Sequence, residues 1–206
     1  MVLIVIEGID GAGKSTQAAL LAKRLHSLGY EAIGAREPTD GPVGIFLRNA
    51  LSGSIKLNLL TMQLLFVADR NEDIAALSGS IARKVVILDR YYYSTIAYGS
   101  IEGIDKRYLE TLNSIFPRPD KTFMLEISPR EALERLSKSR HTPEVLENRR
   151  ALEAAAKAYK GFSGPEIERI DGSAAPELIS NVLLSKTLDM LKGAGVRRKR
   201  LSSDRT

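Results

Sequence analysis

Residues 3–16 constrain the fold of this chain more than any other segment. They read Leu-Ile-Val-Ile-Glu-Gly-Ile-Asp-Gly-Ala-Gly-Lys-Ser-Thr, an apolar run that leads into a G-x-x-x-x-G-K-[ST] pattern. Glycines allow a tight turn whose amide N–H groups point inward at an anion. A helical pattern follows from residue 15, and the positive end of its dipole favours phosphate at the same place. This order of strand, loop and helix predicts a nucleoside-triphosphate site.

Two side chains of this loop have the chemistry that a triphosphate site needs. Lys14 is long enough to reach the β- and γ-phosphates, and the Ser15 hydroxyl is a ligand for Mg²⁺. The predicted phosphate-binding loop consists of Gly8, Ile9, Asp10, Gly11, Ala12, Gly13, Lys14, Ser15 and Thr16.

Length and composition favour one globular domain. The chain has 206 residues, of which 44% are apolar, and this is enough to bury a core. It contains no cysteine, which excludes disulfides and thiolate metal sites and fits a cytoplasmic enzyme. The apolar run at residues 1–6 is too short to span a membrane and has no basic leader before it.

The net charge of +5 is concentrated at the end of the chain. Residues 197–206 contain five basic side chains and one acidic side chain, so they account for +4 of the total. The remainder of the chain is almost neutral, and we expect no nucleic acid as a partner. We predict one folded domain at residues 1–192 and a basic, flexible tail at residues 193–206.

Apolar strand-like runs alternate with helical patterns, which is typical of a parallel sheet with helical crossovers. The pattern predicts an α/β fold of about five strands with helices on both faces. Strands are expected at residues 2–7, 30–36, 84–89, 122–127 and 168–171, and helices at 15–28, 43–52, 57–78, from 129 onward, 145–159 and 175–191.

A polar stretch at residues 137–144 interrupts the helical pattern. It is rich in basic side chains, and Arg149 follows it. A solvated helix face explains such a run, and the functional alternative is a short helical lid at about 137–150. Such a lid would bring arginines to the phosphates when it closes.

Asp89 ends an apolar strand and is followed directly by Arg90. A turn-forming aspartate and a Mg²⁺ ligand beside the phosphate loop explain Asp89 equally well. Arg90 favours the second interpretation, because both side chains would lie at the carboxyl edge of the sheet, where ligands bind in open α/β folds. A metal-binding carboxylate and a phosphate-binding guanidinium would then be neighbours.

Two further groups indicate a second ligand. Arg36-Glu37-Pro38 ends the second strand, and Phe66 and Arg70 lie four residues apart, on one side of a helix. A flat ring can stack on a base while a guanidinium binds its carbonyl oxygens. The alternative is a core phenylalanine and a solvated arginine.

Together these segments closely resemble the thymidylate kinase family, a group of nucleoside-monophosphate kinases with the P-loop NTPase fold. The resemblance runs from Leu3 to about Leu191. Its markers are the loop from Glu7 to Thr16, Arg36-Glu37-Pro38, Leu65 to Arg70, and Asp89-Arg90-Tyr91 with Ser94 and Tyr98. It implies transfer of the γ-phosphoryl of ATP, with Mg²⁺, to dTMP, which gives dTDP and ADP in the course of dTTP synthesis.

The resemblance also assigns roles to single residues. Lys14 and Arg90 would be catalytic, and Ser15, Asp89 and Glu37 would organise the metal. Acceptor binding would fall to Asp10 at the sugar, Glu37, Arg48 and Arg90 at the phosphate, Phe66 stacked on thymine, Arg70 at its edge, Ser94, and Tyr98 against the 2′ position. Asp171 and Gly172 would lie near the adenine of ATP.

Two positions depart from the family pattern. Some members of the family carry an arginine in the phosphate loop, where this chain has Gly11, and the other members carry it in the lid. In this chain Arg140, Arg149 or both would therefore supply it. A glutamine or threonine that is common in the family is replaced by Gly99, which removes one base contact. Thymine selectivity is therefore less firmly implied than phosphoryl transfer.

Three functions stay open at this point. The resemblance favours a thymidylate kinase, which in this family is usually a homodimer. A kinase for another nucleoside monophosphate or for a nucleoside is the nearest alternative. A P-loop switch or regulatory ATPase is a third, but the chain contains no Asn-Lys-x-Asp motif for reading guanine.

Overall fold

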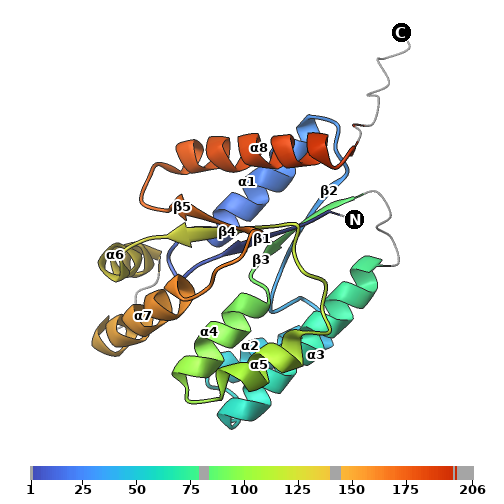
Figure 1. Ribbon diagram of the computed structural model, residues 1–206. Helices are drawn as coiled ribbons and strands as arrows, with labels where there is room; N and C mark the ends of the chain where they lie inside the picture. The colour runs from blue at the N-terminus through green and yellow to red at the C-terminus, as the bar shows by residue number, and fades with distance from the viewer. Residues whose placement is uncertain (1, 79–83, 140–144, 197, 199–206) are drawn as a thin grey trace.

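A parallel sheet forms the centre of the molecule in the computed structural model, which describes residues 2–78, 84–139, 145–196 and 198. In these residues the sheet has five strands in the order β2-β3-β1-β4-β5, and all four pairings are parallel (Figure 1). The predicted α/β fold is confirmed. The strands are β1 (Val2–Glu7), β2 (Ala32–Arg36), β3 (Val85–Asp89), β4 (Lys121–Glu126) and β5 (Ile167–Asp171).

Helices cover both faces of the sheet. α1 and α8 lie on one face, and α3, α4, α5 and α7 lie on the other (Figure 1). The described helices are α1 (Lys14–Ser27), α2 (Pro42–Leu51), α3 (Leu59–Ser78), α4 (Tyr92–Ile101), α5 (Lys106–Asn113), α6 (Pro129–Ser139), α7 (Val145–Lys160) and α8 (Pro176–Gly193). The arrangement is that of the P-loop NTPase fold.

β1 is the central strand, and all six of its residues are buried. It pairs with β3 on one side and β4 on the other, with Ile6 opposite Asp89 and Phe123. Because the strands are parallel, the segments that follow β1, β2 and β3 all leave the sheet at one edge. In the order β2-β3-β1-β4-β5, the chain runs from β1 to β2 on one side of the sheet and from β3 across β1 to β4 on the other side. In open α/β folds, ligands bind at the point where the direction of the connections changes in this way.

Most helix starts follow from local sequence signals. Ser128 and Glu131 form a capping box at the start of α6, since Glu131 N donates to Ser128 Oγ at 3.2 Å and Ser128 Oγ donates to Glu131 Oε2 at 2.8 Å. α4 and α5 are the helices that the pattern does not predict. α4 contains the run Tyr-Tyr-Ser-Thr-Ile, which is rich in the aromatic and β-branched residues that are typical of strands.

The predicted lid and tail are only partly described. α6 ends at Ser139 and α7 begins at Val145, so Arg140 lies outside the described residues. Of the predicted tail, residues 193–196 and 198 are described, and the guanidinium of Arg198 lies 5.5 Å from the ring centroid of Tyr30. The lid and tail therefore stay predictions.

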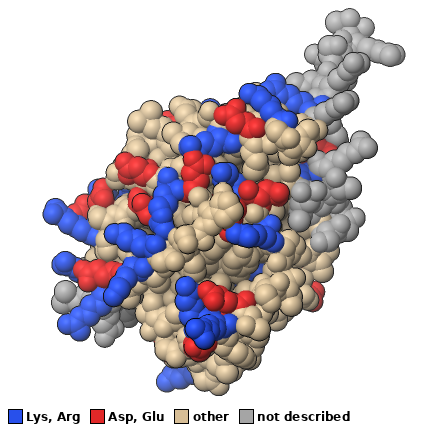
Figure 2. Space-filling view, viewed as in Figure 1, with Lys and Arg blue, Asp and Glu red and all other residues tan. Residues whose placement is uncertain are grey.

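The surface carries charges of both signs. On the face shown in Figure 2, Lys and Arg side chains alternate with Asp and Glu, and basic side chains gather over α6 and α7. Within the described ranges, none of the helices combines the length and the apolar character needed to cross a membrane.

Candidate active site

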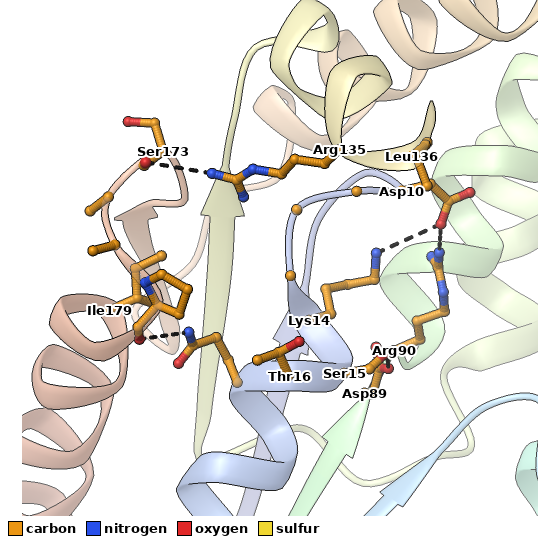
Figure 3. A pocket seen from close by; sticks show the side chains of 17 residues that line it. Asp10, Lys14, Ser15, Thr16, Asp89, Arg90, Arg135, Leu136, Ser173 and Ile179 are labelled. Atoms are coloured by element: carbon orange, nitrogen blue, oxygen red, sulfur yellow. Dashed lines mark hydrogen bonds and ion pairs between the residues drawn. The ribbon is translucent and has the colours of Figure 1, made fainter. Parts of the chain in front are cut away.

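The phosphate loop between β1 and α1 brings two cations to one carboxylate. Asp10 Oδ1 lies 3.8 Å from Lys14 Nζ and also forms an ion pair with Arg90 Nη2. Figure 3 shows both cations pointing at Asp10. Lys14 Nζ also donates a hydrogen bond of 2.8 Å to the carbonyl of Ile9, so the lysine side chain folds back along the inside of the loop.

Lys14 is enclosed, with 6% of its side chain exposed. Burial lowers the pKa of the Lys14 ammonium to about 8, and the nearby positive charge of Arg90 acts in the same direction. The carboxylates of Asp10 and Asp89 oppose this effect. Lys14 is thus an enclosed cation whose burial is only partly offset by nearby carboxylates, and an added anion such as a phosphate would stabilise its charge.

Gly11 packs directly against α6. Its φ is +82°, and a Cβ added there would lie 2.6 Å from the backbone oxygen of Ala132. An arginine at this position therefore does not fit unless α6 moves. The absence of the arginine that some family members carry has a structural reason in this chain.

Asp89 ends β3 beside the phosphate loop. Ser15 Oγ donates a hydrogen bond to Asp89 Oδ2, whereas Asp89 Oδ1 is buried and has no partner among the described residues. A buried carboxylate oxygen without a partner is costly, and a hydroxyl beside it is a second oxygen ligand. The residues present therefore fit Mg²⁺.

In the described part of the chain, no group of three or more His, Cys, Asp or Glu side chains is placed to hold a metal ion. Mg²⁺ in nucleotide sites is usually bound by one or two protein groups together with phosphates and water. Glu37, the third predicted metal residue, forms an ion pair with Arg70, as described below.

Arg90 has a left-handed backbone conformation, with φ of 75°. Such a conformation is rare for a residue with a Cβ and persists only when its surroundings fix it. Arg90 N donates to the Ile6 carbonyl at 3.1 Å, and the next amide, Tyr91 N, donates to Glu7 Oε1 at 2.8 Å. The backbone of β1 and the Glu7 carboxylate thus hold Arg90 at the edge of the sheet.

Ser94 connects Arg90 to the buried Glu7. Arg90 Nη1 donates to Ser94 Oγ at 3.1 Å, and Ser94 Oγ donates to Glu7 Oε2 at 2.7 Å. Tyr159 of α7 also donates to Glu7 Oε2, at 3.0 Å. Ser94 therefore orients the guanidinium, and it also lines the second cavity described below.

A cavity of about 740 Å³ opens above the phosphate loop (Figure 3). The predicted loop residues from Asp10 to Thr16 line it, whereas Gly8 and Ile9 do not. Asp171 and Gly172 do not line it, but the residues that follow them do. The wall that the sequence does not predict is formed by Gln17, Arg135, Leu136, Ser173, Ala174, Ala175, Pro176 and Ile179.

A second cavity, of about 620 Å³, lies between α3, α4 and the loop after β2. It is lined by the predicted residues Asp10, Glu37, Phe66, Arg70, Arg90, Ser94 and Tyr98. The sequence does not predict the rest of the wall, which is formed by Pro38, Ala50, Leu51, Gly53, Ile55, Lys56, Leu57, Leu59, Met62, Gln63, Thr95 and Glu102. Asp10 and Arg90 line both cavities.

Arg70 is directed into the protein interior. Its Nε donates to Glu37 Oε1 at 3.0 Å, its Nη2 pairs with Glu37 Oε2, and its Nη1 donates to Asn113 Oδ1. Burial raises the pKa of Glu37 to about 7, and the positive charge of Arg70 opposes the shift. Both oxygens of Glu37 accept from Arg70, and the backbone N of Glu37 donates to the Asp89 carbonyl at 3.1 Å. The role of Glu37 at the metal stays a prediction.

Two further predicted arginines lie outside both cavity walls. Arg48 Nη1 donates to the Pro38 carbonyl at 3.0 Å, and Arg48 Nη2 lies 3.1 Å from Asp40 Oδ1. Arg48 therefore supports the loop after β2. Arg149 lies on α7, where its Nε is 2.9 Å from Glu153 Oε1 and the pair is exposed.

Comparison with known proteins agrees with this geometry. The sequence model of the thymidylate kinase family matches residues 6–182. A probable thymidylate kinase of Thermococcus kodakarensis is 37% identical over 196 residues, which cover 88% of this chain and 95% of that protein. A thymidylate kinase of Desulfotalea psychrophila is 34% identical over 195 residues, which cover 93% and 96%. A probable thymidylate kinase of Methanocaldococcus jannaschii is 36% identical over 156 residues, which cover 76% and 78%. This chain belongs to the thymidylate kinase family.

Proposed function

We propose that this protein transfers the γ-phosphoryl group of ATP to the 5′-phosphate of dTMP and so produces dTDP and ADP. The observation that carries the proposal is the wall shared by the two cavities, because Asp10 and Arg90 line both. A phosphoryl group that passes from a nucleotide in one cavity to a nucleotide in the other would cross at these residues.

The acceptor is itself an anionic phosphate, so a strong general base is not needed. Alignment of the two phosphates and neutralisation of their charge are then the main contributions to catalysis. Lys14 and the loop amides would bind the triphosphate, and Arg90 would bind the group in transfer. Asp10, which pairs with both cations, would exchange these contacts for the sugar of the acceptor when the phosphates arrive.

Ser15 and Asp89 are the residues that would hold Mg²⁺. When bound, the ion neutralises charge on the β- and γ-phosphate oxygens. The buried, unpartnered Oδ1 of Asp89 supports this assignment.

The acceptor base would stack on Phe66, which is half-buried and lines the second cavity. Tyr98 would crowd the 2′ position and favour deoxyribose. Arg70 keeps only one N–H that is not used by Glu37, Asn113 or Thr95, so it would offer the base a single hydrogen bond. Its larger contribution would be to fix the wall of the base site.

The proposal includes a lid at about 137–150 that carries Arg140 and Arg149, a cytoplasmic location, and a homodimer. Apolar side chains on the outer faces of α2 and α3 support the homodimer, because Phe46, Leu60 and Leu64 are each 41% exposed. Light scattering of the purified protein would measure the mass in solution, and a monomer at every concentration would contradict this part.

A panel of acceptors tests the function. ADP release is measured with ATP and each of dTMP, dUMP, dCMP, dGMP and dAMP, and also with thymidine and without any acceptor. We expect the highest kcat/KM with dTMP. A preference for another monophosphate or for the nucleoside would indicate a different kinase. A rate of ADP release that is the same with every acceptor and without any would indicate a switch or regulatory ATPase.

A further inference from the structure

Gln63, which lines the second cavity, packs against Gly99 of α4. A Cβ added to Gly99 would lie 2.7 Å from Leu109 Cδ1 and 3.2 Å from Gln63 Cδ. The carboxamide of Gln63 therefore occupies the space into which a side chain at position 99 would project. The polar group beside Gly99 is thus supplied by a different helix, α3.

Gln63 lies on the same side of α3 as the other proposed base contacts. It precedes Phe66 by three residues and Arg70 by seven, which is the spacing of one helix face. All three side chains line the second cavity. A base stacked on the Phe66 ring would thus have Arg70 toward one end of this face and Gln63 toward the other.

The hydrogen bonds of Gln63 leave one atom unused. Gln63 is 3% exposed, and its Nε2 donates to Glu102 Oε2 at 3.2 Å. Its Oε1 is buried and accepts no hydrogen bond from any described residue. An ionised carboxylate only accepts hydrogen bonds, so the amide nitrogen of Gln63 faces Glu102 and its Oε1 is the atom left without a partner.

We propose that Gln63 is a specificity-determining residue whose Oε1 accepts a hydrogen bond from an N–H of the acceptor base. The inference rests on the proposed function. Thymine and uracil carry an N3–H, a donor that the unpartnered acceptor oxygen of Gln63 can bind. The N3 of cytosine carries no hydrogen and would face Gln63 Oε1 lone pair to lone pair. A buried polar group left without a partner is a strong source of discrimination.

The first test replaces Gln63 by methionine, which has similar length and shape but no acceptor oxygen. kcat/KM is measured for dTMP, dUMP and dCMP. We expect Gln63→Met to lower kcat/KM for dTMP and dUMP about tenfold or more, mainly through KM, and to leave dCMP within about threefold. The KM for ATP is the internal control and should not change, because Gln63 does not line the first cavity.

The second test exchanges the two members of the pair. In the double variant Gln63→Glu with Glu102→Gln, the new glutamine donates to the new carboxylate, which keeps one acceptor oxygen and the same net charge. We expect the dTMP to dCMP ratio to return to within about threefold of the wild-type ratio. A merely structural role for Gln63 would not predict this recovery.

The outcomes separate this inference from the proposed function. If wild-type protein does not use dTMP, the proposed function fails. If wild-type protein uses dTMP but Gln63→Met lowers kcat/KM for dTMP and for dCMP by the same factor, or lowers neither value, the role of Gln63 is overturned. If Gln63→Met does not fold, the double variant decides, and a dTMP to dCMP ratio far below wild type would overturn the role.

Discussion

Glu37 and Arg70 form an ion pair that is almost completely enclosed, with side chains 3% and 1% exposed. The pair ties the end of β2 to the middle of α3, and Arg70 extends the connection to α4 and α5 through Thr95 and Asn113. The guanidinium also lies 5.2 Å from the ring centroid of Tyr91 and 5.4 Å from that of Phe116. This part of the wall of the second cavity is therefore built around a buried ion pair.

The first prediction concerns this pair. Arg70→Met leaves the Glu37 carboxylate buried without its partner, so we expect the free energy of unfolding to fall by about 3–5 kcal/mol. Urea denaturation of the wild-type protein and the variant measures this difference in unfolding free energy. Adding Glu37→Leu removes the stranded charge and should recover most of the loss.

An exposed pair provides the control for this experiment. Arg130 and Glu134 lie one turn apart on α6, with Nε and Oε1 3.0 Å apart and side chains 87% and 55% exposed. Arg130→Met should change the unfolding free energy by less than about 0.5 kcal/mol. Equal effects of Arg70→Met and Arg130→Met would contradict the importance assigned to burial.

The second prediction concerns pH. A lysine binds phosphate in its charged form, and this form is lost as the pH rises through the pKa, which for Lys14 is about 8 in the free protein. We therefore expect kcat/KM for ATP to fall above about pH 8, whereas kcat should fall only at higher pH because bound phosphates raise the pKa of Lys14. In Lys14→Arg the fall above pH 8 should be absent, since arginine stays charged. If kcat/KM of the wild-type protein for ATP is constant up to pH 10, the charge of Lys14 does not have this role in ATP binding.

The third prediction concerns Arg90. Removing one donor to a transition state typically lowers turnover by ~10²-fold or more, so Arg90→Ala should lower kcat at least that far. The fold should persist, because Ile6 and Glu7 bind the backbone of Arg90 and Tyr91 rather than the guanidinium. Arg130→Ala is the control and should retain wild-type kcat. Near-normal turnover of Arg90→Ala would contradict the assigned role.

The fourth prediction concerns the lid. Gly11 leaves no space for an arginine in the phosphate loop, so at least one of Arg140→Ala and Arg149→Ala should lower kcat by ~10²-fold. Single-turnover measurements with saturating ATP and dTMP separate this loss from weaker binding. Wild-type rates in both variants would exclude the lid arginines from catalysis.

Much of the fold could be predicted because its signals are local. β1 is an unbroken apolar run before a glycine loop, and its predicted bounds agree with the structure. The capping box from Ser128 to Glu131 likewise lies within four residues. Periodicity and capping depend on neighbours in the sequence, so they are readable without knowledge of the tertiary fold.

The start of α4 could not be predicted for the opposite reason. Its N-cap residue, Tyr91, offers no side-chain cap, and the amides of Tyr91 and Ser94 are satisfied by Glu7, which lies 84 residues earlier than Tyr91. The environment of Arg70 is equally non-local, since Glu37 and Asn113 come from distant parts of the chain. Sequence spacing identifies such residues, but only the fold decides which atoms they use.

The last prediction concerns the packing around Gly99. Gly99→Ala introduces a Cβ 2.7 Å from Leu109 Cδ1, so we expect the free energy of unfolding to fall by about 1–3 kcal/mol, as in other overpacked cores. The same methyl group would displace the Gln63 carboxamide, and the KM for dTMP should rise while the KM for ATP stays constant. Gly193→Ala is the matched control, because a Cβ there meets nothing within 4 Å and its helical position tolerates alanine. If the two alanine variants unfold at the same urea concentration, a Cβ at position 99 is tolerated, and the prediction is wrong.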